Sequence, residues 1–122
     1  MDPLGATTWV IAEGYIPGSS NGPEPQMLSH ETVCLLNTGD EDAHVEITVF
    51  LTDAEPLGPW QLTVPARRTV HQRFNDLRDP EVPRDTSYAS VIRSDRPVVA
   101  QHTRLDSRQA ENALLTTIAY PA

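Results

Sequence analysis

The sequence predicts an all-β protein, a single-domain antiparallel β-sandwich or jelly-roll-like barrel of about eight short strands. Eleven prolines are spread from Pro3 to Pro121 and leave little room for long helices. The segments between them are short, and several alternate apolar and polar residues. With 122 residues, of which 39% are hydrophobic, the chain can bury one core, so we expect one domain over residues 1–122.

The expected strands are bounded by segments rich in Gly, Pro, Asp and Asn. The clearest strand is 43–52, where Val45, Ile47 and Val49 alternate with polar residues and should face the core. Together the strands are expected at residues 8–13, 31–37, 43–52, 60–64, 67–75, 87–93, 97–103 and 113–120.

The connections differ in length and chemistry. A long irregular loop is expected at 14–29, which contains three Gly and three Pro. A turn is expected at 94–96, and a charged loop with room for one helical turn at 76–86. The run 101–112 is an unusually polar connection between two apolar segments. The alternative for residues 106–117 is a short helix, because that stretch contains good helix formers.

The charge balance narrows the range of partners. The formal net charge is −8 and the pI is near 4.7, so the protein on average repels phosphate backbones and anionic lipid surfaces. All nine basic residues are Arg, which suits fixed ion pairs, although a coding bias explains the absence of Lys equally well. A basic stripe would support only weak, salt-dependent DNA binding, and it comprises Arg67, Arg68, Arg73 and Arg78.

Three side chains carry expectations about burial. Cys34, the single cysteine, lies in an apolar run and is expected to be a buried small hydrophobe. Trp9 suits either the core or sugar stacking, with the core favoured, and Trp60, at a Pro-flanked turn, is expected to be partly exposed.

The N-terminus lacks the features of a secretory signal, and no run approaches the ~20 apolar residues that cross a bilayer. We therefore expect a soluble, cytoplasmic protein without membrane insertion.

No motif for catalysis or metal binding is found. Ser29, His30 and Glu31 are adjacent, but neighbours on a strand point to opposite faces, and there is no GxSxG elbow. We therefore predict no catalytic residue, no metal and no cofactor, and the protein is not expected to be an enzyme. The histidines are widely spaced and form neither HxH nor HExxH; they are His30, His44, His71 and His102.

The remaining hypothesis is a polar recognition surface for a ligand or a protein partner. Arg104 and Arg108 could pair with Asp106 and Glu111 across a subunit boundary, and these charges could equally close an oligomer and bind nothing else. The candidate residues are charged, His or Trp side chains: Trp9, Glu13, Glu24, His30, Glu31, Arg67, Arg68, His71, Arg73, His102, Arg104, Asp106, Arg108 and Glu111.

Five motifs in order resemble the Anabaena-type sensory rhodopsin transducer family: WVIAEGYIP, GPEPQ, SHETVCLLNTGDEDAHVEIT, LTVPARRTVHQRFNDL and QHTRLDSRQAENALLTTIAY. The resemblance extends from about Trp9 to Tyr120. It implies a small all-β cytoplasmic protein that forms a homotetramer and binds the cytoplasmic face of a seven-helix sensory rhodopsin. A DNA-associated regulatory role and a likeness to carbohydrate-binding modules have also been proposed for the family. The family has no agreed catalytic residues that could be assigned to this chain.

Two functions therefore lead. The first is a cytoplasmic signal transducer or adaptor that binds proteins as a homotetramer. The alternative is a sensor module for a small sugar or anion, linked to transcriptional regulation. A metal-dependent enzyme is the third candidate.

Overall fold

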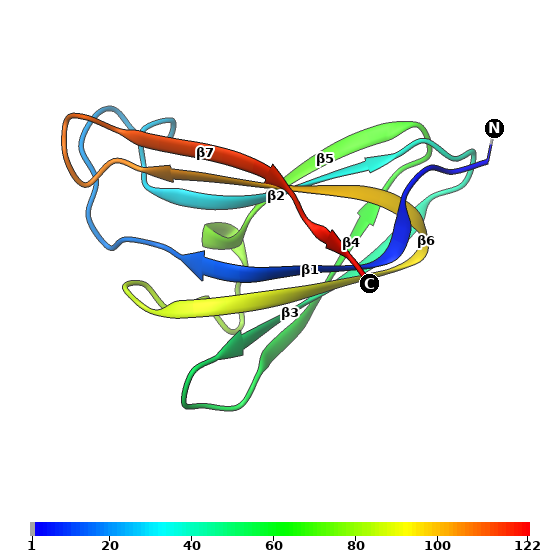
Figure 1. Ribbon diagram of the computed structural model, residues 1–122, viewed down its shortest axis with the longest axis horizontal. Coiled ribbons are helices and arrows are strands. Elements are labelled where there is room, and N and C mark those ends of the chain that lie inside the picture. Colours follow the sequence, from blue (N-terminus) through cyan, green and yellow to red (C-terminus); the bar gives the residue numbers. More distant parts are fainter. Residues whose placement is uncertain (1) are drawn as a thin grey trace.

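The computed structural model describes residues 2–122 and contains eight antiparallel strands and one 3-10 helix in that range (Figure 1). The predicted all-β class and the predicted β-sandwich are confirmed. The elements are β1 (Ala6–Tyr15), β2 (His30–Asn37), β3 (Ala43–Leu51), β4 (Leu57–Val64), β5 (Arg68–Arg73), η1 (Phe74–Asp76), β6 (Ser87–Asp106), β7 (Ala113–Ile118) and β8 (Tyr120–Pro121).

The long strand β6 contributes to both layers of the sandwich. Its first half pairs with β1 and β3, so that Val91 lies opposite Val10 and Thr48. Its second half pairs with β2 and β7, so that Thr103 lies opposite Thr32 and Thr116. One layer has the order β4-β3-β6-β1-β8 and the other has the order β5-β2-β6-β7. Figure 1 shows the yellow first half of β6 in one layer and its gold second half in the other.

The predicted turn at 94–96 is wrong, because the chain stays extended there. Ser94 still pairs with Val45 of β3, and Val98 already pairs with Ala6 of β1. Residues 95–97 lie between the ladders, so Pro97, which has no N–H to donate, costs no ladder hydrogen bond. Two predicted strands are therefore one strand that crosses between layers.

The core lies between the layers and follows the predicted alternation. Val45, Ile47 and Val49 of β3 are fully buried, while the intervening side chains face outward. Val33 and Leu35 of β2 supply the facing layer and are also fully buried. Burying side chains of this size stabilises the fold by about 1.5–3 kcal/mol each.

Both tryptophans belong to this core. Trp9 donates its indole N–H to the carbonyls of Ala6 and Val98, and only 5% of it is exposed. The expected partial exposure of Trp60 is wrong. A loop folds over its ring, and its indole N–H donates to the carbonyls of Arg78 (2.9 Å) and Pro80 (3.2 Å).

Other boundaries differ from the sequence expectation. The predicted strand 67–75 ends at Arg73, because Phe74 turns into η1 and is buried. The polar run 101–112 is strand as far as Asp106, and only its second half is a turn. The alternative helix in residues 106–117 is absent, since β7 pairs with β6 along its whole length. Its pairing partner therefore decided the conformation of this stretch.

Cys34 was expected in the core but lies on the outer face of its layer. Its neighbours Val33 and Leu35 are buried inward, so the pleat turns Cys34 outward, where it is half-buried. Burial raises the pKa of its thiol. The apolar composition of residues 33–36 predicts burial for the whole run, whereas only Val33 and Leu35 are buried.

Candidate functional site

A buried carboxylate, Glu31, lies between the two layers. It is on β2 directly opposite Arg104 of β6, and its side chain is completely buried. Arg104 donates from Nε to Oε2 (2.6 Å) and from Nη2 to Oε1 (3.2 Å), which is a bidentate ion pair. The pairing register therefore joins two charges that are 73 residues apart in the chain.

Two further donors complete the environment of Glu31. His102 Nε2 donates to Oε1 (3.2 Å), and the backbone N–H of Tyr15 donates to the same oxygen (3.1 Å). Burial by itself would raise the pKa of Glu31, but hydrogen bonds and positive charge from His102 and Arg104 outweigh it, so the pKa lies below its ordinary value. Glu31 is thus a carboxylate held ionised inside the protein.

Tyr88, in the first half of β6 and therefore in the other layer, lies beside Glu31 and Arg104. Its ring packs against Gly14 so closely that a Cβ on that glycine would lie 2.3 Å from the ring. Its hydroxyl is buried and has no hydrogen-bond partner within residues 2–122. Burial, followed by the charge of Glu31, raises the pKa of Tyr88. The neutral phenol is therefore the form that this environment stabilises.

The cluster reaches the surface through Arg104. Its Nη1 donates to Glu13 of β1 (3.3 Å), whose side chain is 77% exposed. A cleft of about 280 Å³ lies there between β1 and the β7–β8 segment, with Leu115, Ile118 and Tyr120 along its apolar side. A second cavity, of about 260 Å³, continues past Arg104 to Tyr15 and Arg108. Polar groups at the base of an apolar cleft are typical of ligand sites.

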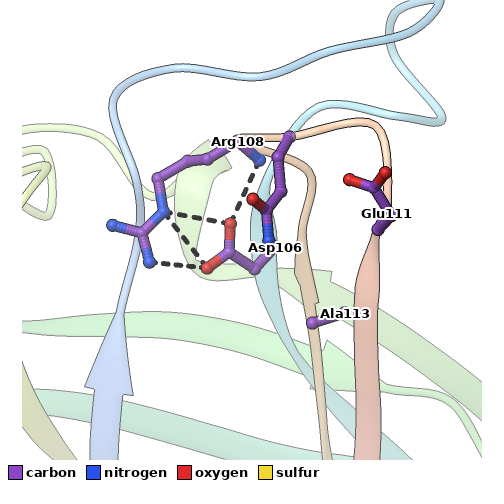
Figure 2. Close-up of a pocket in the computed structure, with 5 residues that line it drawn as sticks. Asp106, Arg108, Glu111 and Ala113 are labelled. Carbon is purple, nitrogen blue, oxygen red and sulfur yellow. Dashed lines mark hydrogen bonds and ion pairs between the residues drawn. The ribbon is translucent and has the colours of Figure 1, made fainter.

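The β6–β7 hairpin carries an ion pair within the chain. Arg108 donates from Nη2 to Asp106 Oδ2 (2.6 Å) and from Nε to both carboxylate oxygens. Figure 2 shows Arg108 folded back onto Asp106, with Glu111 across the pocket. Glu111 makes no ion pair with any residue in 2–122. Arg104 and Arg108 therefore each pair with a carboxylate of the same chain. Pairing across a subunit boundary stays a prediction.

The loop before β2 is fixed to the same hairpin. The Ser107 backbone N–H donates to Ser29 Oγ (3.0 Å), and the Ser107 hydroxyl donates to the Met27 carbonyl. Asn75 donates to the Ser29 carbonyl (3.0 Å) and accepts from the Glu31 backbone N–H (3.3 Å). These small buried polar residues position Glu31, and no sequence motif singled them out.

A separate pocket lies on the outer face of the β5-β2-β6 layer. It has a volume of about 370 Å³. Its six lining residues come from three neighbouring strands: His30, Thr32 and Cys34 from β2, His71 and Arg73 from β5, and Thr103 from β6. None of the six has a carboxylate side chain.

The fourteen candidate residues do not form one surface. Trp9 is in the core, and Glu24 is exposed on the long loop. Arg67 adopts a positive φ of 54° and pairs with Asp40 (3.1 Å), and Arg68 donates to a backbone carbonyl beside it. The other candidates separate into two groups. One follows the cleft and the hairpin, with Glu13, Glu31, His102, Arg104, Asp106, Arg108 and Glu111; the other lines the outer pocket, with His30, His71 and Arg73.

The basic stripe expected for DNA binding is not continuous. Arg67 and Arg68 lie at the start of β5, and Arg73 at its other end. Arg78 lies beyond η1, where it donates to the carbonyls of Asn75 and Leu77. The four residues therefore offer no single track for a phosphate backbone.

Within residues 2–122, no group of three or more His, Cys, Asp or Glu side chains is arranged to hold a metal ion. No helix in the same range is long and apolar enough to cross a membrane.

The family model described as "Anabaena sensory rhodopsin transducer" matches residues 4–121. The protein belongs to this family. A solved structure named "Anabaena sensory rhodopsin transducer" is 65% identical over 84% of this chain and 99% of its own, with a TM-score of 0.76. A second, titled "Crystal Structure of Thermotoga maritima 1070", is 34% identical over 97% of this chain and 96% of its own, with a TM-score of 0.85. No curated protein sequence gave a match. The family resemblance predicted from the sequence is confirmed.

Proposed function

We propose that this protein is a non-catalytic, cytoplasmic signal-transducing adaptor that binds a protein partner as a homotetramer. The observation that carries the proposal is the 65% identity to a protein named as a sensory rhodopsin transducer, over 84% of this chain. The proposed domain comprises residues 1–122, and the proposed partner is a seven-helix sensory rhodopsin or another membrane receptor. A family match over residues 4–121 supports the domain assignment.

The surface proposed for assembly is formed by β7 and β8. All six residues of β7 are exposed. Within residues 2–122 β7 pairs with β6 alone, so its other edge has unpaired backbone groups there. The β7–β8 segment exposes four large apolar side chains: Leu114 (70% exposed), Leu115 (46%), Ile118 (59%) and Tyr120 (70%). Exposed apolar side chains beside an unpaired strand edge favour contact with another copy of the chain.

A binding titration tests the partner. The full chain is titrated into a sensory rhodopsin in lipid nanodiscs, and the heat of binding is measured by calorimetry. We expect saturable binding by the wild type and weakened binding by Leu114→Glu, since the assembled form is the proposed binding form. The matched control is Phe50→Ser, which removes an exposed apolar side chain (42% exposed) from β3 in the other layer. Absence of binding by the wild type would overturn the rhodopsin assignment.

A second candidate function is a sensor module for a small sugar or anion, linked to transcriptional regulation. The supporting observation is the pair of cavities beside Arg104, with apolar walls on one side and ion-paired polar groups at the base. A thermal-shift screen with sugars, nucleotides and carboxylates tests it. A panel that leaves the melting temperature unchanged would contradict this function and leave the adaptor function intact.

A further inference from the structure

We propose that the outer pocket on the β5-β2-β6 layer binds a small anion that carries two negative charges, such as a phosphate or sulfate group. The pocket is the one lined by His30, Thr32, Cys34, His71, Arg73 and Thr103. This proposal goes beyond both candidate functions, because the outer pocket shares no lining residue with the two cavities beside Arg104. It is independent of tetramer assembly and of receptor binding.

The pairing register brings the lining residues to one face. Cys34 lies opposite His71, and Thr32 lies opposite both Arg73 and Thr103. The intervening residues of β2 point into the core, so all six pocket residues share the outward side of the pleat. Hydroxyl, imidazole and guanidinium donors from three strands therefore converge on one cavity.

The charge of this pocket contrasts with the rest of the protein. The chain has a net charge of −8, yet the pocket contains one Arg, two His and no carboxylate. Arg73 makes no ion pair among residues 2–122, and it donates to the Pro25 carbonyl through Nη1 alone (3.0 Å). Its Nε and Nη2 groups remain available for a bidentate contact, the geometry that Arg uses for phosphate and carboxylate groups.

The two cavities beside Arg104 do not share this property. There Arg104 is paired with Glu31 and Glu13, and Arg108 is paired with Asp106. Each of those guanidinium groups already has a carboxylate partner within the chain. The outer pocket is therefore the better site for an anion from solution.

Two other polar side chains in the pocket are uncommitted. Only 7% of Thr32 is exposed, and neither its hydroxyl nor the His71 ring makes a hydrogen bond within the described part of the chain. The Thr103 hydroxyl is hydrogen-bonded to Thr116 Oγ1 (3.1 Å), and His30 Nδ1 is hydrogen-bonded to the Leu28 carbonyl (2.6 Å), which fixes the His30 ring. An anion with several oxygens matches this set of donors.

Calorimetric titration of the full chain with sodium sulfate, at constant ionic strength and pH 7, tests the proposal. We expect saturable binding that Arg73→Gln weakens about tenfold or more, because a charge-assisted pair is lost. Arg73→Lys should retain part of the affinity. The control Arg68→Gln removes the same charge from the same strand outside the pocket and should change the affinity less than twofold. No saturable binding, or equal losses in the two Gln variants, would overturn the proposal.

Light scattering and thermal melting on each variant show whether a loss of sulfate binding comes from the pocket itself or from unfolding or disassembly. Folded variants with wild-type mass that no longer bind sulfate support the site. Wild-type protein that keeps its mass and its receptor binding but binds no sulfate would overturn this inference alone. Sulfate binding by a protein that is monomeric would instead contradict the assembly proposal and support the pocket.

Discussion

Replacing Arg104 with Gln is expected to destabilise the fold by about 3–5 kcal/mol at pH 7, the usual cost of removing one partner of a buried ion pair. Arg104 donates to both oxygens of Glu31, whose side chain has no exposed area. Gln can replace one hydrogen bond but supplies no charge. Glu31 would then be a buried carboxylate without the charge of Arg104, although it keeps the hydrogen bonds from His102 and from the Tyr15 backbone N–H.

The loss of stability caused by Arg104→Gln should become smaller as the pH falls. In the wild type the pKa of Glu31 is lowered from its ordinary value of 4.5, so the stabilisation is present above pH 4.5 and is lost as pH falls through the lowered value. Without Arg104, burial raises the pKa of Glu31. Protonation at acidic pH then removes the buried charge, and the variant loses less stability. The difference in unfolding free energy between wild type and variant should narrow from pH 7 to pH 4.

Urea unfolding followed by tryptophan fluorescence measures this difference, since Trp9 and Trp60 are both buried. Protein concentration is held constant, because assembly shifts apparent stability. The control is Arg93→Gln on the same strand, where an exposed Arg without an ion pair in residues 2–122 should cost less than about 0.5 kcal/mol. A loss below about 1 kcal/mol for Arg104→Gln, or a difference that does not narrow at low pH, would refute the reasoning.

Three other substitutions test the fold. Gly5→Ala should cost at least about 1–3 kcal/mol, because φ is +107° and the new Cβ would also lie 2.0 Å from the Val98 carbonyl oxygen. The control in urea unfolding is Gly18→Ala, whose new Cβ would meet only the end of the Asp85 side chain. Asn37→Ala should cost about 1–3 kcal/mol, since the buried amide donates to the carbonyls of Glu41 and Val64; a melting temperature equal to that of the wild type would contradict this. Leu35→Ala, at a fully buried position, should cost about 2–5 kcal/mol by the same unfolding assay.

The alternation of apolar and polar residues and the positions of Pro and Gly predicted the parts of the fold that short stretches of sequence determine. The alternation in residues 43–52 gave the buried face of β3, and the Pro- and Gly-rich composition of 14–29 gave the loop before β2. The strand 31–37 also matches β2 closely. In each case the periodicity or turn chemistry lies within about ten residues.

Long-range pairing decided what the sequence did not predict. Polar residues at 94–96 are typical of a turn, yet pairing with different partners on either side keeps the chain extended. The contact between Glu31 and Arg104 depends on the register of β2 against β6. The candidate residues were chosen as one polar set, and the pleat then distributed them between the interior and the outer face. Trp60 was misjudged because the loop that covers it begins 18 residues later.

We propose that the adaptor assembles through β7 and β8, and the mass of the protein in solution is the decisive measurement of that assembly. Light scattering at micromolar concentration should give four times the 13.5 kDa mass of one chain. Leu114→Glu should lower this mass, because it places a charge in the proposed apolar contact, while Phe50→Ser should not. A wild-type mass of 13.5 kDa across the concentration range would contradict the account.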